Sequence, residues 1–170
     1  MTIKELVRLI KLDVAQSGNS YLNSFFNANV RAVISYRINR YVYESISKKL
    51  AFIMHNRDRL KYSVDIYPSA DIGPGFVVAH IGGIVIGAKV KIGSNFTIQS
   101  NTTIGQKNTN SGVPSIGENV YLGAGSRILG SVKVGSNVLI GANSVVVHDT
   151  RDNVTIVGAP AKEIISDDEE

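Results

Sequence analysis

A six-residue repeat runs through residues 84–105, which read IVIGAKVKIGSNFTIQSNTTIG. Isoleucine recurs in this stretch at Ile86, Ile92, Ile98 and Ile104. A period of six matches neither the 3.6-residue period of a helix nor the two-residue alternation of a simple strand. It fits short strands that meet at three corners, with about 18 residues in each turn of a coil and the aliphatic side chains inside.

The repeat extends outward from this stretch in both directions. Aliphatic residues keep the spacing at positions 66, 72 and 78 before it, and at positions 116, 122, 128, 134, 140 and 146 after it. Four asparagines stand three positions after an aliphatic repeat residue, where asparagine tolerates a left-handed corner: Asn95, Asn119, Asn137 and Asn143. The pattern therefore predicts a parallel β-helix.

Two interruptions break the period. The step from Val78 to Ile86 is longer than six residues, which predicts a bulge over residues 79–83. The step from Ile104 to Ile116 is twelve residues, and the polar, glycine-containing segment 106–113 within it predicts an external loop. Because a regular coil carries no cleft, we expect function at these interruptions.

The chain divides into two unlike parts near residue 63. Residues 1–62 hold eleven basic and four acidic residues, whereas residues 63–170 hold seven basic and ten acidic ones together with fifteen of the sixteen glycines. Leu6, Ile10 and Val14 recur at the spacing of one helix face. The predicted domains are a basic α-helical region (1–62), a β-helix domain (63–165) and an acidic tail (166–170). The basic helices are either a solvated face or a platform for an anionic membrane surface or acidic acceptor.

Composition excludes several classes of protein. The net charge of +4 is too small to indicate nucleic-acid binding. The absence of cysteine excludes disulfides, thiolate metal sites and a cysteine nucleophile. No run of about 18 apolar residues is present, and the charged start of the chain does not resemble a signal peptide, so we expect a cytoplasmic protein.

Three histidines are available for chemistry: His55, His80 and His148. Their separation makes a three-imidazole zinc site unexpected, and no metal is predicted. His80 stands in the predicted bulge near glycines, where an imidazole can accept a proton from a hydroxyl at neutral pH. Asp65 lies almost one coil earlier and could orient it. The spacing equally allows His80 to cap a carbonyl and Asp65 to make an Asx turn.

Residues 65–80, which read DIYPSADIGPGFVVAH, resemble the D-I-H-P…D-H segment of serine acetyltransferases. The resemblance continues to about residue 164. Within the hexapeptide-repeat acyltransferases, the sequence is similar to the polysaccharide O-acetyltransferases. The resemblance implies a left-handed β-helix, a homotrimer with active sites between subunits, and direct acetyl transfer from acetyl-CoA; whether two trimers pair into a dimer of trimers is left open by the sequence. The resemblance also implies that His80 is the general base and that Asp65 orients it.

The resemblance places acetyl-CoA along small residues: Gly105, Gly123, Ala124, Gly141 and Ala142. The negative CoA phosphates favour a basic partner, for which Lys162 and Lys133 are the candidates. The glycines and alanines could equally serve only to fit tight coil corners.

Three departures from the family pattern concern the acceptor site. Ala79 replaces the family's aspartate before the histidine, Tyr67 replaces the D-I-H-P histidine, and Val113 stands where an Arg-His pair precedes the proline. A zwitterion such as serine needs partners for both charges in a partly buried site. These three positions therefore favour a sugar hydroxyl of a surface polysaccharide or glycan as the acceptor. Serine O-acetylation is the alternative, and a non-catalytic β-helix scaffold is a third.

Overall fold

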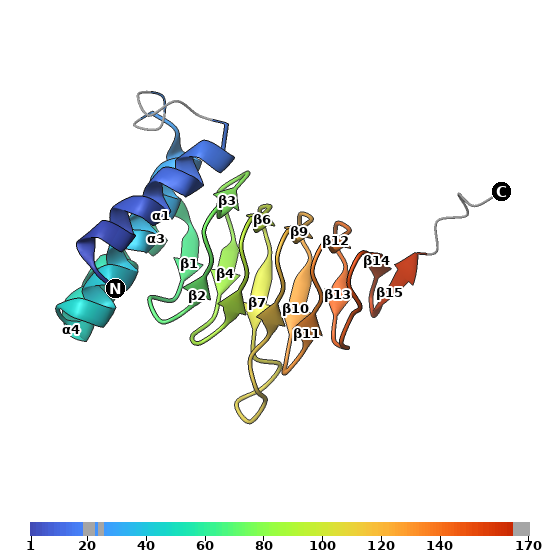
Figure 1. Ribbon diagram of the computed structural model, residues 1–170. Coiled ribbons are helices and arrows are strands. Elements are labelled where there is room, and N and C mark those ends of the chain that lie inside the picture. Colours follow the sequence, from blue (N-terminus) through green and yellow to red (C-terminus); the bar gives the residue numbers. More distant parts are fainter. Residues whose placement is uncertain (19–22, 24–25, 165–170) are drawn as a thin grey trace.

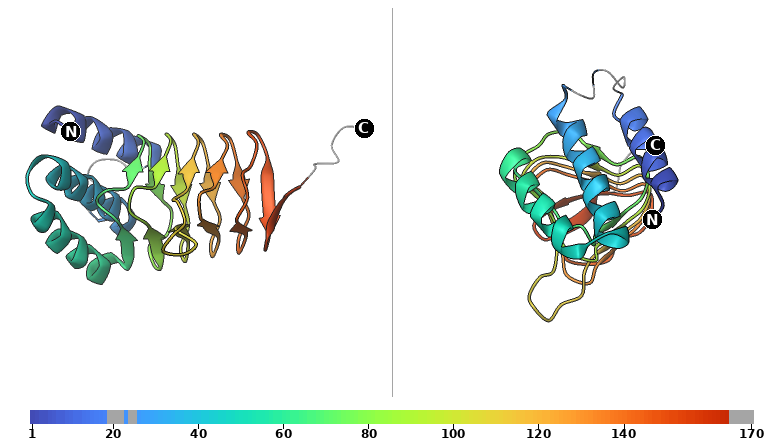
Figure 2. Two further views of the ribbon diagram at one scale, coloured as in Figure 1. Left: turned by 90° about the horizontal axis from the view of Figure 1, so that it is seen from below. Right: turned by 90° about the vertical axis from the view of Figure 1, so that its left-hand side faces the viewer.

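The computed structural model describes residues 1–18, 23 and 26–164 (Figure 1). Among the described residues, three helices precede the strands: α1 (Ile3–Gln16), α3 (Ala28–Ser45) and α4 (Lys48–Tyr62). The helices lie across one end of an elongated stack of strands, and Figure 2 shows this arrangement from two further directions. Helix α4 ends at a left-handed Ser63 (φ 51°), and the first strand begins at the next residue. The predicted acidic tail lies outside the described residues.

The described strands form three sheets, and each of the first four coils contributes one strand to each sheet. Sheet A contains β1 (Val64–Ile66), β4 (Ile84–Ile86), β7 (Thr103–Gly105), β10 (Arg127–Leu129) and β13 (Val145–Val146). Sheet B contains β2 (Asp71–Ile72), β5 (Lys91–Ile92), β8 (Ser115–Ile116) and β11 (Lys133–Val134). Sheet C contains β3 (Val77–Val78), β6 (Thr97–Ile98), β9 (Tyr121–Leu122), β12 (Leu139–Ile140), β14 (Thr155–Gly158) and β15 (Ala161–Ile164). The pairing is parallel except between β14 and β15, which confirms the left-handed parallel β-helix with N-terminal helices.

The register of sheet A confirms both interruptions. Ile66 pairs with Ile86, Ile86 with Ile104, and Ile104 with Ile128, so successive coils take 20, 18 and 24 residues. The first excess corresponds to the 79–83 bulge. The second corresponds to the 106–113 loop, which projects from the coil in Figure 1.

The predicted asparagine corners are also confirmed. Asn95, Asn119, Asn137 and Asn143 have φ between 55° and 57°. Three of them continue a ladder of amides along one edge, because Asn95 donates to Asn119, Asn119 to Asn137 and Asn137 to Asn153 at 2.8–2.9 Å. From the second coil onward, successive coils are therefore joined by a corner side chain as well as by the strands.

A buried ion pair docks the helices on the first coil. Arg37 is fully buried, and its Nε donates to Asp13 Oδ2 at 2.7 Å. Arg40 donates to Asp71 Oδ1 at 2.7 Å on the same coil. Burial raises the pKa of Tyr36 to about 12, so its hydroxyl stays protonated and donates to the Ala70 carbonyl at 2.9 Å. The expectation of a solvated or membrane-facing set of bases is wrong for Arg37 and Arg40, because both face the β-helix.

None of the described helices is long and apolar enough to cross a membrane.

Candidate active site

His80 lies at the corner between β3 of sheet C and β4 of sheet A, and its side chain is exposed. The ring has no hydrogen-bond or ion-pair partner among the described residues. The corner itself is held by Asn29 near the start of α3. Asn29 Nδ2 donates to the Ala79 carbonyl at 2.7 Å, and Asn29 Oδ1 accepts from the Ile81 N–H at 3.2 Å. The two bonds bracket His80, so the backbone is fixed while the imidazole is left available.

Asp65 lies on β1 and its carboxylate is engaged from helix α4. His55 Nε2 lies 2.7 Å from Asp65 Oδ1, and Arg59 Nε forms an ion pair with Asp65 Oδ2 at 3.2 Å. Asp65 and His80 are not hydrogen-bonded to each other in this structure. The role of Asp65 in orienting His80 stays a prediction, as does the role of His80 as a base.

The three residues predicted for the acceptor site have different surroundings. Tyr67 is exposed, and its ring packs against His55 at 5.3 Å between centroids and against Phe52 at 5.5 Å. Ala79 has its carbonyl occupied by Asn29. Val113 ends the 106–113 loop and packs partly buried against the core.

The predicted site residues divide between two edges of the coil. His80, Gly123–Ala124 and Gly141–Ala142 follow strands of sheet C and precede strands of sheet A. Gly105 and Val113 lie instead where the chain passes from sheet A to sheet B. Opposite edges of sheet A therefore carry the two groups within this chain. Lys162 lies on β15 at the far end of sheet C.

The predicted CoA-channel glycines differ in the space beside them. A Cβ at Gly123 would lie 2.7 Å from the Ala142 nitrogen, and one at Gly141 would lie 2.6 Å from Val157 Cγ1. Stacking of coils therefore requires glycine at position 123, where the close atoms belong to the backbone, whereas a Cβ at position 141 would meet only the Val157 side chain at close range. A Cβ at Gly105 would meet nothing within 4 Å, so its smallness is not explained by packing.

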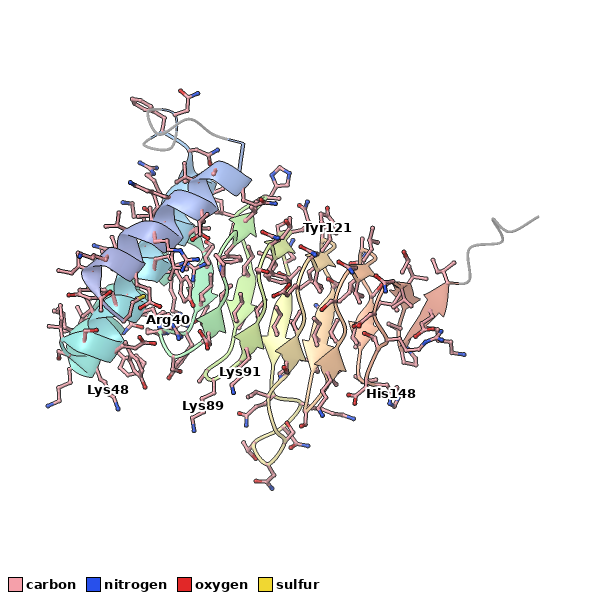
Figure 3. All side chains as sticks on the ribbon, viewed as in Figure 1. Arg40, Lys48, Lys89, Lys91, Tyr121 and His148 are labelled. Carbon is pink, nitrogen blue, oxygen red and sulfur yellow. The ribbon has the colours of Figure 1, made fainter. Side chains whose placement is uncertain are left out.

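Asn29 and His55 are the residues that sequence reasoning missed. Neither belongs to the repeat, and both act across the boundary between helices and coil. His148 lies on the opposite edge from Tyr121 and far from the helices in Figure 3. No group of three His, Cys, Asp or Glu side chains suited to a metal ion occurs within the described part of the chain.

Relatives of known structure and sequence match almost the whole chain. Residues 114–148 match the family model described as bacterial transferase hexapeptide (six repeats). The serine acetyltransferase of Buchnera aphidicola is 36% identical over 164 residues, which cover 94% of this chain and 59% of that protein. The soybean serine acetyltransferase apoenzyme matches with a TM-score of 0.89 and 32% identity, covering 95% of this chain and 69% of that one. A serine acetyltransferase complex with CoA matches with a TM-score of 0.87 and 30% identity, covering 95% and 70%.

The three-sheet coil with interrupted corners defines a hexapeptide-repeat β-helix protein. Within that class, the chain belongs to the serine acetyltransferase-like family. It spans 54–59% of the length of the first curated relatives it matches. The relatives give no support to the polysaccharide branch of the resemblance.

Proposed function

We propose that the protein is an acetyl-CoA-dependent O-acetyltransferase. The observation that carries the proposal is an exposed, unpartnered imidazole, His80, on a corner clamped by Asn29. Membership of a family that includes a serine acetyltransferase solved with CoA supports the co-substrate.

In the proposed mechanism, His80 accepts the proton of the acceptor hydroxyl as the hydroxyl oxygen attacks the acetyl carbonyl carbon. The bond from that carbon to the CoA sulfur then breaks, and the imidazolium returns its proton to the departing sulfur. Asp65 orients the His80 ring and stabilises its charged form. The products are the acetyl ester and CoA thiol, with no net gain or loss of protons.

L-Serine is the first candidate acceptor, because the matched relatives are serine acetyltransferases. A sugar hydroxyl is the second candidate, and a specific observation favours it. Ala79 and Val113 present no charge where the family resemblance places partners for the two charges of serine. A neutral polyhydroxylated acceptor needs hydrogen bonds instead of ion pairs.

Acetyl-CoA binding separates an enzyme from a non-catalytic scaffold. We expect calorimetry to detect saturable binding by the wild type. Gly105→Ala should weaken that binding without loss of stability, because its Cβ enters open space that we assign to the pantetheine arm. Gly87→Ala is the matched control, since a Cβ there lies no closer than 3.4 Å to its neighbours. No binding by the wild type would contradict the enzyme proposal.

A homotrimer with active sites between subunits would explain why the predicted site residues lie on two separate edges of the coil. It would bring the His80 edge of one subunit beside the 106–113 loop of another. Two inactive variants, His80→Ala and a deletion of residues 107–112, should then regain partial activity when they are mixed, unfolded and refolded together. No regain of activity in trimers shown to contain both chains would contradict shared sites.

A peripheral membrane contact of the helices is a separate part of the proposal. Helices α1 and α4 keep exposed bases beside exposed apolar residues: Ile3, Lys4, Val7, Arg8, Lys11, Lys49, Ile53, Arg57, Leu60 and Lys61. Basic and apolar side chains together favour anionic lipid surfaces. We expect the protein to co-sediment with vesicles that contain phosphatidylserine and not with phosphatidylcholine vesicles. Equal sedimentation with both would contradict the contact.

A further inference from the structure

His55 is a buried histidine that the proposed mechanism does not use. It is 4% exposed, and burial lowers its pKa, which favours the neutral ring. A carboxylate only accepts hydrogen bonds, so the 2.7 Å contact with Asp65 Oδ1 requires the proton on His55 Nε2. The contact therefore assigns one ring proton to Nε2, and the lowered pKa favours the neutral tautomer in which Nδ1 is an acceptor.

A small cavity lies against His55. It has a volume of about 10 Å³, which is about one water-sized sphere. Its lining includes His55, Asn39 and Asp58 together with Tyr36 and Tyr62. Asn39 is 2% exposed, and its Oδ1 is the one buried side-chain polar atom without a partner among the described residues.

The orientation of the Asn39 amide is set by its neighbour. Asn39 Nδ2 donates to Asp58 Oδ2 at 2.6 Å, so a flipped amide would place two oxygens against each other. Asn39 Oδ1 therefore stays an acceptor. A single water in the cavity can donate one proton to Asn39 Oδ1 and the other to His55 Nδ1.

We propose that His55 is a positioning residue that holds the Asp65 carboxylate in place for His80, with its tautomer fixed by one buried water shared with Asn39. The inference rests on the proposed function. His55 takes no part in the reaction, because its Nε2 is bonded to Asp65 and its ring is buried. The groups that face it are Asp65 and Tyr67 from the first coil, Arg59 and Asp58 from α4, and Tyr36 and Asn39 from α3.

The tautomer can be measured without any turnover. In the full-length protein labelled with ¹⁵N-histidine, only three imidazoles contribute signals. We expect His55, assigned by its loss in a His55→Gln variant, to carry a proton on Nε2 and none on Nδ1 at pH 6.5, where a free imidazole is half protonated. A cationic ring at that pH, or a proton on Nδ1, would overturn the proposal.

A matched pair of variants tests the consequence for turnover. Glutamine can place its amide nitrogen where His55 has Nε2, whereas asparagine is one methylene too short. We expect His55→Gln to keep kcat within about threefold of the wild type, and His55→Asn to lower kcat by about 10- to 100-fold with an unchanged KM for acetyl-CoA. Equal effects of the two variants, or a change in KM alone, would overturn the role of His55.

The outcomes separate this inference from the proposed function. A wild type that releases no CoA with any acceptor contradicts the proposed function. A wild type that turns over, beside a folded His55→Asn variant of equal kcat, contradicts the positioning role alone. Variants of the two exposed histidines, His80→Gln and His148→Gln, assign the remaining His55 signal by elimination, so the NMR measurement decides the tautomer even where His55→Gln fails to fold.

Discussion

Arg37 and Asp13 form a buried ion pair that joins two helices to the first coil. Neither side chain is more than 2% exposed, and the guanidinium also donates to the carbonyl oxygens of Ile72 and Gly73. Asp13 Oδ1 in turn accepts from the Phe76 N–H at 2.9 Å. The two side chains therefore form hydrogen bonds with backbone groups of the coil as well as with each other.

Removal of one partner should destabilise the protein strongly. We expect Arg37→Met to lower the free energy of unfolding by about 3–5 kcal/mol, because Asp13 is left as an uncompensated buried charge. Urea denaturation at pH 7 measures this. Arg31→Met, at an exposed position on the same helix, should change stability by no more than about 0.5 kcal/mol. Similar losses in both variants would show that the pair has no special role.

Loss of the proposed base should abolish most turnover. We expect His80→Ala to lower kcat by about two to four orders of magnitude, which is the usual contribution of general-base catalysis. Its acetyl-CoA affinity and stability should match the wild type, since the ring is exposed and makes no hydrogen bond. A variant with near wild-type turnover would remove His80 from the mechanism.

Asn29 should affect turnover because it holds the backbone on both sides of His80. In Asn29→Asp, the donor to the Ala79 carbonyl becomes an acceptor, so that bond is replaced by a repulsion. We expect kcat to fall by about 10- to 100-fold, because the bond that fixes the Ala79 side of the corner is lost while the acceptor for the Ile81 N–H remains. Asn27→Asp controls for charge near the start of α3. If both variants lose the same activity, charge rather than the clamp is responsible.

Stability should depend on pH through His55. Its pKa is lower in the folded protein than in the unfolded chain, because burial disfavours the charged ring. Below pH about 6.5 the unfolded chain binds a proton that the folded protein does not, so stability falls as pH falls, until the folded pKa is reached. We expect the wild type to lose more stability between pH 7.5 and 5.5 than His55→Gln does. Parallel losses in urea titrations would contradict this assignment.

The coil could be predicted from sequence because its determinants are local. A buried aliphatic residue every sixth position and a left-handed asparagine at a corner follow from one coil and its neighbour, so Asn119 and Ile104 are where the repeat predicts them. The interruptions at 79–83 and 106–113 could be predicted for the same reason, because each is a local departure from the six-residue period.

The docking of the helices could not be predicted, because it is tertiary. Nothing in the spacing of Arg37 or His55 shows which helix face meets the first coil. From the sequence pattern alone, Arg37 and His55 could equally be solvent-exposed basic residues on a helix surface. The proposed juxtaposition of His80 and Val113 could not be derived from the repeat either, since the two residues lie on different edges of the coil in one chain.

The release of CoA thiol from acetyl-CoA tests the central claim most directly, and a protein without cysteine gives a clean thiol signal. The assay compares no acceptor, L-serine, and a panel of sugars and sugar nucleotides. We predict release of CoA thiol that depends on a hydroxyl acceptor and on His80. Release with L-serine would support the acceptor used by the relatives, and release with a sugar would support the acceptor inferred from the uncharged Ala79 and Val113. No acceptor-dependent release by a folded protein that binds acetyl-CoA, or equal release by His80→Ala, would contradict the account.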